Sequence, residues 1–284
     1  MGLLDGRTAI VTGAAQGLGL AIAQRFVAEG ARVMLADLQA DKVSAAAKSL
    51  HAPSGAVASQ SLDVTSSKEV DELIRSTVSH FGVFDILVNA AGGSGRVAVE
   101  SIDEVTDELW DQVVDSNLKG TFLCCRAAVP HLRRRGRGSI VSFASGAVTG
   151  VAGGRDATTT AVRHAYAAAK AGLLGLANQL AKDLVKDDVS VNVVLPGFVM
   201  TEPGARVRDL FDGMSEDSRQ AMLARITPRT PPEVGWAIAY LVSEPGRGHS
   251  GTAMRLAGKI DNADLAVTPE GDTPLGRFAR LAPR

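Results

Sequence analysis

Short apolar runs alternate with longer helical patterns along most of the 284-residue chain. Strands that are apolar throughout, separated by amphipathic helices, are typical of a parallel sheet covered on both faces. The pattern therefore predicts an α/β fold: a single-domain Rossmann-type doubly wound parallel sheet flanked by helices on both faces. The expected strands cover residues 8–12, 32–36, 56–62, 84–89, 139–143, 189–195 and 252–256, and the expected helices cover residues 17–29, 41–50, 66–81, 105–135, 165–185 and 232–242.

Two loops and a tail interrupt this alternation. Residues 146–164 form a loop rich in Gly, Thr and Arg between a strand and a helix, and residues 198–230 form a polar, partly helical excursion. Long loops at the carboxyl ends of strands commonly carry function. We expect one domain over residues 1–257 and a polar C-terminal tail over residues 258–284.

Composition and charge exclude several classes of protein. A formal net charge of -1 gives no electrostatic bias toward nucleic acid or anionic membranes, and the basic run Arg133–Arg137 is better explained as a solvated helix end. No apolar run is long enough to span a membrane, and we expect no signal peptide before Thr8. The two cysteines, Cys124 and Cys125, form neither a disulfide framework nor a zinc site. We therefore expect a cytoplasmic protein without a metal.

A glycine-rich loop lies between the first expected strand and the first expected helix, over Thr12 to Gly19. Its three glycines allow a tight turn and a close approach of the backbone to a pyrophosphate, which the free N–H groups of the helix start would bind. The alternative is an ordinary tight turn, but the strand–loop–helix context favours a dinucleotide site. The residues of this loop that we predict to bind the cofactor are Gly13, Gln16, Gly17, Leu18 and Gly19.

The second expected strand ends at Asp37, which lies 18 residues beyond Gly19. The dinucleotide fingerprint places an acid about 20 residues past the glycines, where it binds the adenosine ribose. Its carboxylate would repel a 2′-phosphate, and Leu38 supplies no compensating cation, so we predict NAD over NADP. The alternative for Asp37 is a solvated acid or a helix cap. Asp63, before Val64 at the end of the third strand, is either near the adenine or a turn residue.

Tyr166 and Lys170 stand four residues apart on an expected helix and therefore share one face. A free phenol has a pKa of about 10, and a nearby cation favours the phenolate, which suits general acid–base catalysis. Such pairs also arise by chance, when a lysine extends past an aromatic ring. The context decides here, because the pair follows a strand and its end at Ser142–Ser145 in a chain that carries a dinucleotide loop.

With these motifs in this order, the chain resembles the short-chain dehydrogenase/reductase family from about Leu4 to Ala257. The motifs that carry the resemblance are Thr12-Gly13-x-x-x-Gly17-x-Gly19, Asn89-Ala-Ala-Gly92, Asn117-Leu-Lys-Gly120, Ser145, Tyr166-x-x-x-Lys170 and Pro196-Gly197-x-x-x-Thr201. The resemblance implies an NAD-dependent enzyme that transfers a hydride between a secondary alcohol or ketone and the cofactor. Residues 1–257 would then form the dinucleotide-binding and catalytic domain.

The resemblance also implies a role for each matched residue. Tyr166 would be the general acid/base, and Ser145, or alternatively Ser142, would hold the substrate oxygen. Lys170 would bind the nicotinamide ribose and lower the Tyr166 pKa, while Asn117 would support a water chain to solvent. Other implied cofactor contacts are Asp63, Val64, Asn89, Ala90, Gly92, Pro196, Gly197, Val199 and Thr201. A homotetramer is implied, with a dimer as the alternative because the C-terminal motif departs from the family.

Substrate choice is the least determined property. The predicted substrate-binding residues are Ser145, Arg155, His164 and Phe198. The loop that holds Arg155 and Arg163 would lie beside the cleft, and Phe198 and Met200 would supply apolar surface, which suits a medium-sized cyclic or polar secondary alcohol. Alternatively, the arginines tie the loop down and the apolar residues pack in the core.

Two other classes of function compete with the dehydrogenase hypothesis. A dinucleotide-sensing or scaffold protein could use the same fold without catalysis. A serine hydrolase needs a glycine two residues before its nucleophile, where Phe143 stands before Ser145. We expect a small-molecule alcohol or ketone as the partner and neither nucleic acid nor membrane.

Overall fold

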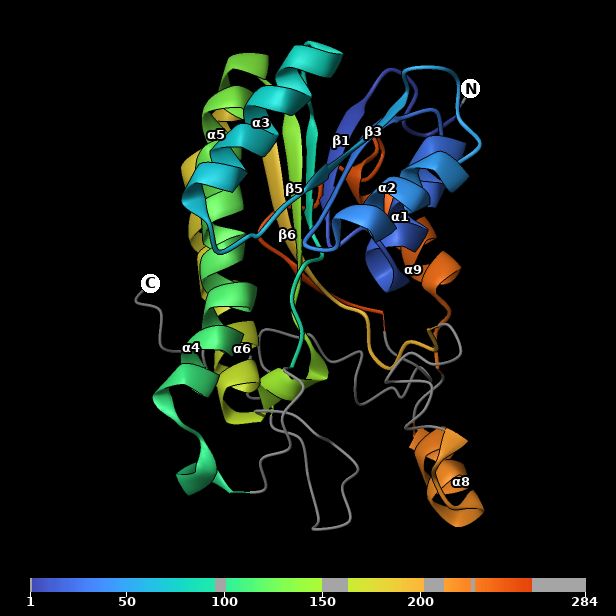
Figure 1. The fold of residues 1–284 in the computed structure, drawn as a ribbon, viewed down its shortest axis with the longest axis vertical. Coiled ribbons are helices and arrows are strands. Elements are labelled where there is room, and N and C mark those ends of the chain that lie inside the picture. The colour runs from blue at the N-terminus through green and yellow to red at the C-terminus, as the bar shows by residue number, and fades with distance from the viewer. Residues whose placement is uncertain (1, 95–100, 150–162, 202–211, 226–227, 257–284) are drawn as a thin grey trace.

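The computed structural model describes residues 2–94, 101–149, 163–201, 212–225 and 228–256. Within these residues, seven parallel strands form one sheet in the order β3-β2-β1-β4-β5-β6-β7 (Figure 1). The strands are β1 (Thr8–Thr12), β2 (Arg32–Asp37), β3 (Val57–Ser61), β4 (Ile86–Asn89), β5 (Gly138–Phe143), β6 (Val189–Leu195) and β7 (Ala253–Arg255). The strand order reverses at β1, as in a doubly wound sheet. The fold class predicted from the sequence is therefore confirmed.

Helices cover both faces of the sheet, as Figure 1 shows. The helices of one face are α1 (Gly17–Ala28), α2 (Ala40–Ser49) and α9 (Pro231–Val242), and those of the other are α3 (Ser67–Phe81), α5 (Gly120–Arg135) and α6 (Arg163–Leu184). Phe26 and Ile238 lie in the buried apolar cluster of the first face. Leu73 and Leu132 lie in that of the second. Each helix buries the apolar stripe that its sequence spacing predicts.

The single long helix expected over residues 105–135 is interrupted. Helix α4 (Asp107–Val114) runs into a π-helical turn, η2 (Asp115–Lys119), before α5 begins. The N–H of Gly120 donates to the carbonyl of Asp115, five residues back. Turns of this kind are rare and occur frequently at functional sites. This one contains Asn117, which is fully buried.

Four further elements complete the described fold: η1 (Ile102–Glu104), η3 (Gly146–Thr149), η4 (Val185–Asp187) and α8 (Glu216–Arg225). Helix α8 lies within the excursion predicted to be partly helical. No helix of the described segments is long and apolar enough to cross a membrane. The predicted C-terminal tail, residues 258–284, lies outside the described residues.

A buried ionic cluster lies at the amino end of β4. Asp85 is fully buried and receives Arg135 Nε at 3.1 Å and Arg137 Nε at 3.3 Å. Arg7, itself buried, approaches the same carboxylate with Nε at 3.8 Å. Burial lowers the pKa of Arg7, and the charge of Asp85 opposes that shift. The basic run before β5 is thus more than a solvated helix end, because two of its arginines bind this carboxylate.

The two adjacent cysteines are free and buried. Burial raises the pKa of Cys125 to about 12, and Asn89 opposes this with a hydrogen bond. Burial also raises the pKa of Cys124. Both side chains are therefore protonated thiols at neutral pH, as expected of cysteines that pack in a core.

Candidate active site

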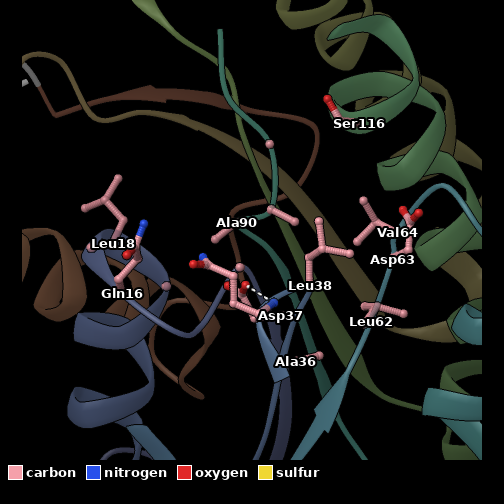
Figure 2. Close-up of a pocket in the computed structure, with 16 residues that line it drawn as sticks. Gln16, Leu18, Ala36, Asp37, Leu38, Leu62, Asp63, Val64, Ala90 and Ser116 are labelled. Carbon is pink, nitrogen blue, oxygen red and sulfur yellow. Dashed lines mark hydrogen bonds between the residues drawn. The ribbon is translucent and has the colours of Figure 1, made fainter. Parts of the chain in front are cut away.

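A cavity of about 450 Å³ opens at the carboxyl ends of β1, β2, β3 and β4 (Figure 2). This is the place where the strand order reverses, and ligands of open α/β sheets bind there. The residues that line it are Gly13, Gln16, Gly17, Leu18, Gly19, Ala36, Asp37, Leu38, Gln39, Leu62, Asp63, Val64, Ala90, Ala91, Gly92 and Ser116. The cavity thus gathers the glycine loop, the acid of β2 and the segments after β3 and β4.

Two glycines of the loop stand where no side chain fits. A Cβ on Gly13 would lie 2.7 Å from the backbone nitrogen of Ala91, and a Cβ on Gly19 would lie 2.1 Å from the carbonyl oxygen of Gly13. The side chain of Gln16, the residue before α1, makes no capping hydrogen bond within the described part of the chain. The first N–H groups of α1 are therefore left without a side-chain cap beside the cavity. This arrangement fits an anionic group such as a pyrophosphate.

Asp37 is held by the backbone on both sides of its carboxylate. Its Oδ2 accepts from the N–H of Ala15 at 3.1 Å, and its Oδ1 accepts from the N–H of Gln39 at 3.0 Å. The side chain therefore stabilises the turn after β2 and also lines the cavity. Leu38, beside it, is 69 % exposed. Asp37 can bind a ribose hydroxyl and also hold this turn, because one carboxylate has several lone pairs.

Asp63 likewise both forms a turn and lines the cavity, where the sequence left open whether it is a turn residue or lies near the adenine. Its Oδ1 accepts from the N–H of Thr65 at 2.9 Å and from Thr65 Oγ1 at 2.8 Å, so it forms the turn after β3. It also lines the cavity, next to Val64. In Figure 2 these two residues lie on the segment that leaves β3, on the side of the cavity away from Gln16 and Leu18.

Asn89 is not among the described residues that line the cavity. It is buried, and its Nδ2 donates to Ser142 Oγ at 3.2 Å and to Cys125 Sγ at 3.5 Å. Successive residues of a strand point to opposite faces of the sheet, and Asn89 points toward α5. Its neighbour Ala90 reaches the cavity instead, as does Gly92.

Asn117 fixes the segment that follows β4. Its Nδ2 donates to the carbonyl of Gly93 at 2.8 Å, and its Oδ1 accepts from the N–H of Gly93 at 3.1 Å. Gly92 adopts φ 131°, and a Cβ there would lie 2.5 Å from Asn117 Oδ1. The amide therefore requires a glycine at 92 and positions one wall of the cavity. Ala91 and Ser116 also line this wall, and sequence reasoning missed them although each adjoins a motif residue.

Tyr166 and Ser145 meet at the carboxyl end of β5, the strand next to β4. The phenol of Tyr166 forms a hydrogen bond with the side chain of Ser145. Burial raises the pKa of Tyr166 above its ordinary value, and the bond to Ser145 opposes that rise. Ser142 is bound to Asn89 instead. The structure thus favours Ser145 over Ser142 as the serine that acts with the tyrosine.

Lys170 lies beside this pair on the next turn of α6. It is buried, its Nζ donates to the carbonyl of Phe143 at 2.7 Å, and the same atom lies 5.5 Å from the centre of the Tyr166 ring. Burial lowers the pKa of Lys170 to about 8. The sequence led us to expect that this lysine lowers the Tyr166 pKa, but in the described protein burial outweighs any such effect. The phenol is therefore protonated at neutral pH and suited to donate a proton.

The segment after β6 brings a further polar group to the same edge of the sheet. Thr201 Oγ1 is buried and has no hydrogen-bond partner among the described residues. Gly197 adopts φ 73°, which turns the chain after Pro196. Val199 is buried against the core and pairs with Arg229. An unpaired buried hydroxyl is costly unless a ligand completes it.

Only some of the residues predicted to bind the substrate lie in the described part of the chain. His164 lies in the first turn of α6, and its Nδ1 is buried with no partner among the described residues. Phe198 is half-buried after β6. Arg155 lies outside the described residues, and so does the side chain of Arg163.

The chain is similar to several known proteins. A family model described as enoyl-(acyl carrier protein) reductase matches residues 13–258. An uncharacterized oxidoreductase of Mycobacterium bovis is 37 % identical over 256 residues, which are 90 % of this chain and 97 % of the relative. The D-threitol dehydrogenase of Mycolicibacterium smegmatis is 33 % identical over 265 residues, 93 % of this chain and 92 % of the relative. The crystal structure of gox2181 superposes with a TM-score of 0.76 at 31 % identity and covers 89 % of this chain and 95 % of its own.

Proposed function

Since the chain belongs to the short-chain dehydrogenase/reductase family, whose members are oxidoreductases that use nicotinamide dinucleotides, we propose that it is an NAD-dependent enzyme that interconverts a secondary alcohol and a ketone. The observation that carries the proposal is the hydrogen bond between Tyr166 and Ser145, one strand away from the 450 Å³ cavity. A half-buried phenol beside a serine hydroxyl can bind and protonate a carbonyl oxygen. A dinucleotide fits the cavity, because the backbone of the glycine loop and the uncapped start of α1 can bind its phosphates.

The proposed mechanism assigns one task to each residue. A bound nicotinamide dinucleotide supplies or accepts the hydride. The hydroxyl of Ser145 holds the substrate oxygen. Tyr166 donates a proton to that oxygen when a ketone is reduced and accepts it when an alcohol is oxidised, so the proton and the hydride leave the alcohol together. We assign to Lys170 the binding of the nicotinamide ribose, and to Asn117 the support of the water chain that returns the proton to solvent.

The preference for NAD rests on Asp37. Its carboxylate is fixed at the cavity by Ala15 and Gln39, where an adenosine ribose would lie. The negative 2′-phosphate of NADP would face this carboxylate, and neighbouring Leu38 is apolar and offers no compensating cation. Like charges this close disfavour binding. The working direction that we propose is alcohol oxidation, because the cellular NAD pool is largely oxidised.

We expect kcat/KM with NAD to exceed that with NADP by at least about tenfold, a factor that needs only about 1.4 kcal/mol of repulsion. Asp37→Asn removes the charge at constant shape and should reduce this ratio. Asp41→Asn, on an exposed acid in the first turn of α2, is the matched control and should leave it unchanged. Steady-state rates with both cofactors at one substrate concentration measure the ratio. A preference for NADP in the unaltered protein would contradict the assignment.

The proposed substrate is a medium-sized cyclic or polar secondary alcohol. Ser145, His164 and Phe198 are the described residues that we assign to its binding, with Arg155 from the preceding loop. A panel of such alcohols with NAD, and of their ketones with NADH, tests the whole proposal through the absorbance of the reduced nicotinamide. The absence of turnover with a protein that still binds NADH would favour the sensing or scaffold alternative.

We also propose a homotetramer in the cytoplasm, with α5 and α6 at one interface. Exposed small residues of α6, Ala168, Ala171 and Gly175, would allow a second helix to approach closely, and Phe122 of α5 is 42 % exposed. Gly172 of the same helix packs on Leu118 of its own chain instead, because a Cβ at position 172 would lie 2.8 Å from Leu118 Cδ2.

Light scattering should give four times the 29.5 kDa chain mass at micromolar concentration. Gly175→Arg would place a charged side chain in the proposed interface and should shift the mass toward smaller species. A dimer would leave one proposed interface, and a monomer would contradict the assembly altogether.

A further inference from the structure

Arg229 lies across the segment that follows β6 and holds it from both sides. Its N–H donates to the carbonyl of Phe198 at 2.8 Å, and its carbonyl accepts from the N–H of Met200 at 2.7 Å. These two bonds form a parallel bridge between Val199 and Arg229 outside the main sheet. The peptide groups on either side of Val199 are therefore fixed to one residue, 30 positions further along the chain.

The guanidinium group of Arg229 is in turn fixed by two other elements. Its Nε donates to the carbonyl of Leu256 at 2.9 Å, just after β7, and its Nη1 lies 3.5 Å from the carboxylate of Glu233 in the first turn of α9. Leu256 itself donates to the carbonyl of Leu195 at the end of β6. A planar guanidinium has donors in fixed directions and can serve both partners, whereas an ammonium cannot match both as well.

This clamp lies directly beside the unpaired hydroxyl of the site. Thr201 follows Met200, and its buried Oγ1 has no partner among the described residues. The backbone that aims Thr201 is the segment that Arg229 holds. The bridge between Val199 and Arg229 joins the two ends of the segment predicted as an excursion over residues 198–230.

We propose that Arg229 is a positioning residue of the cofactor site, which fixes residues 198–200 so that the Thr201 hydroxyl keeps the orientation needed to bind the nicotinamide end of the cofactor. This inference rests on the proposed function and adds a residue that the sequence motifs did not indicate. Arg229 does not reach the ligand in this scheme. It acts through the backbone next to Thr201, and the cost of binding falls because the segment is ordered beforehand.

Removing the guanidinium tests the proposal. Arg229→Ala should raise the Kd for NADH, measured by fluorescence titration, by about tenfold, and should lower kcat/KM for NAD by about 10- to 100-fold, since small misplacements of binding groups cost this much. Arg229→Lys should recover part of the loss. Arg247→Ala is the matched control, because Arg247 pairs with Asp188 and Glu244 away from the cavity. It should leave the Kd for NADH unchanged.

A double-mutant cycle separates positioning from a general loss of structure. Thr201→Val removes the hydroxyl at nearly constant shape, so the Arg229→Ala penalty on NADH binding should shrink in that background. Equal penalties in both backgrounds, or normal NADH binding by Arg229→Ala, would overturn the inference and leave the proposed function intact. Failure of the unaltered protein to bind NADH would refute the proposed function itself.

Discussion

Replacing Tyr166 by phenylalanine is expected to lower kcat by about 10²- to 10⁴-fold, the usual contribution of general acid–base catalysis. The variant keeps the ring that packs near Lys170 and loses only the hydroxyl that bonds Ser145. NADH binding should persist, because the cavity is lined by other residues. Stopped-flow or steady-state turnover together with NADH titration measures both quantities. Near-normal turnover by this variant would remove Tyr166 from the mechanism.

A control and a pH profile sharpen this prediction. Tyr240, the chain's other tyrosine, is 46 % exposed on α9, and Tyr240→Phe should leave kcat unchanged. An ordinary phenol is ionised in about one molecule in a thousand at pH 7, and burial raises the pKa of Tyr166 further. Alcohol oxidation needs the phenolate, so its kcat/KM should rise with pH through the neutral range. Ketone reduction needs the phenol and should not rise.

Replacing Asp85 by asparagine is expected to lower the free energy of unfolding by about 3–5 kcal/mol, because it leaves the buried guanidinium of Arg7 without its main counterion. The carboxylate is fully buried and is approached by three arginines, of which Arg7 has a side chain only 7 % exposed. At about 2–4 °C per kcal/mol, the Tm should fall by roughly 6–20 °C. Thermal unfolding followed by circular dichroism measures the shift.

The comparison with an exposed ion pair decides whether burial causes the effect. Glu72 pairs with Arg75 on the surface of α3, so Glu72→Gln should leave the Tm nearly unchanged. Asp85 lies at the amino end of β4, away from the cavity, so Asp85→Asn should keep its kcat at temperatures where it is folded. An unchanged Tm would show that the cluster adds nothing to stability. A fall in kcat without a fall in Tm would tie Asp85 to the site instead.

Several residues of the candidate site can be predicted from local sequence patterns. The glycines of the first loop, Asp37 and the Tyr166–Lys170 pair were all identified from residue type and spacing. Spacing suffices for them because a strand–loop–helix turn and a four-residue step on a helix fix neighbours within a few residues of each other. The burial of a side chain does not follow from such local spacing. The direction of the Tyr166 pKa shift therefore differed from the direction that the neighbouring lysine suggested.

Contacts between segments far apart in the sequence required the structure. Asn89 occupies a motif position, yet its side chain turns away from the cavity toward Cys125 and Ser142, because the pleat of β4 decides which face it meets. The sequence left Ser142 as an alternative to Ser145, and the bond to Tyr166 supports Ser145. Arg229 contacts Glu233 four residues away, but its bonds to the segments after β6 and β7 span about 30 residues and follow from no local pattern.

The sequence by itself determined the α/β class, the alternation of strands and helices, and the chemistry available at the carboxyl ends of the strands, because each of these follows from hydrophobic spacing and residue type over short distances. Only the tertiary structure decided which polar side chains meet. Strand order and register bring Arg7, Arg135 and Arg137 to one buried carboxylate, and they bring Arg229 to the segment before Thr201. Those pairings are set by the packing of whole elements, in which a shift of one residue turns each side chain to the opposite face of the sheet.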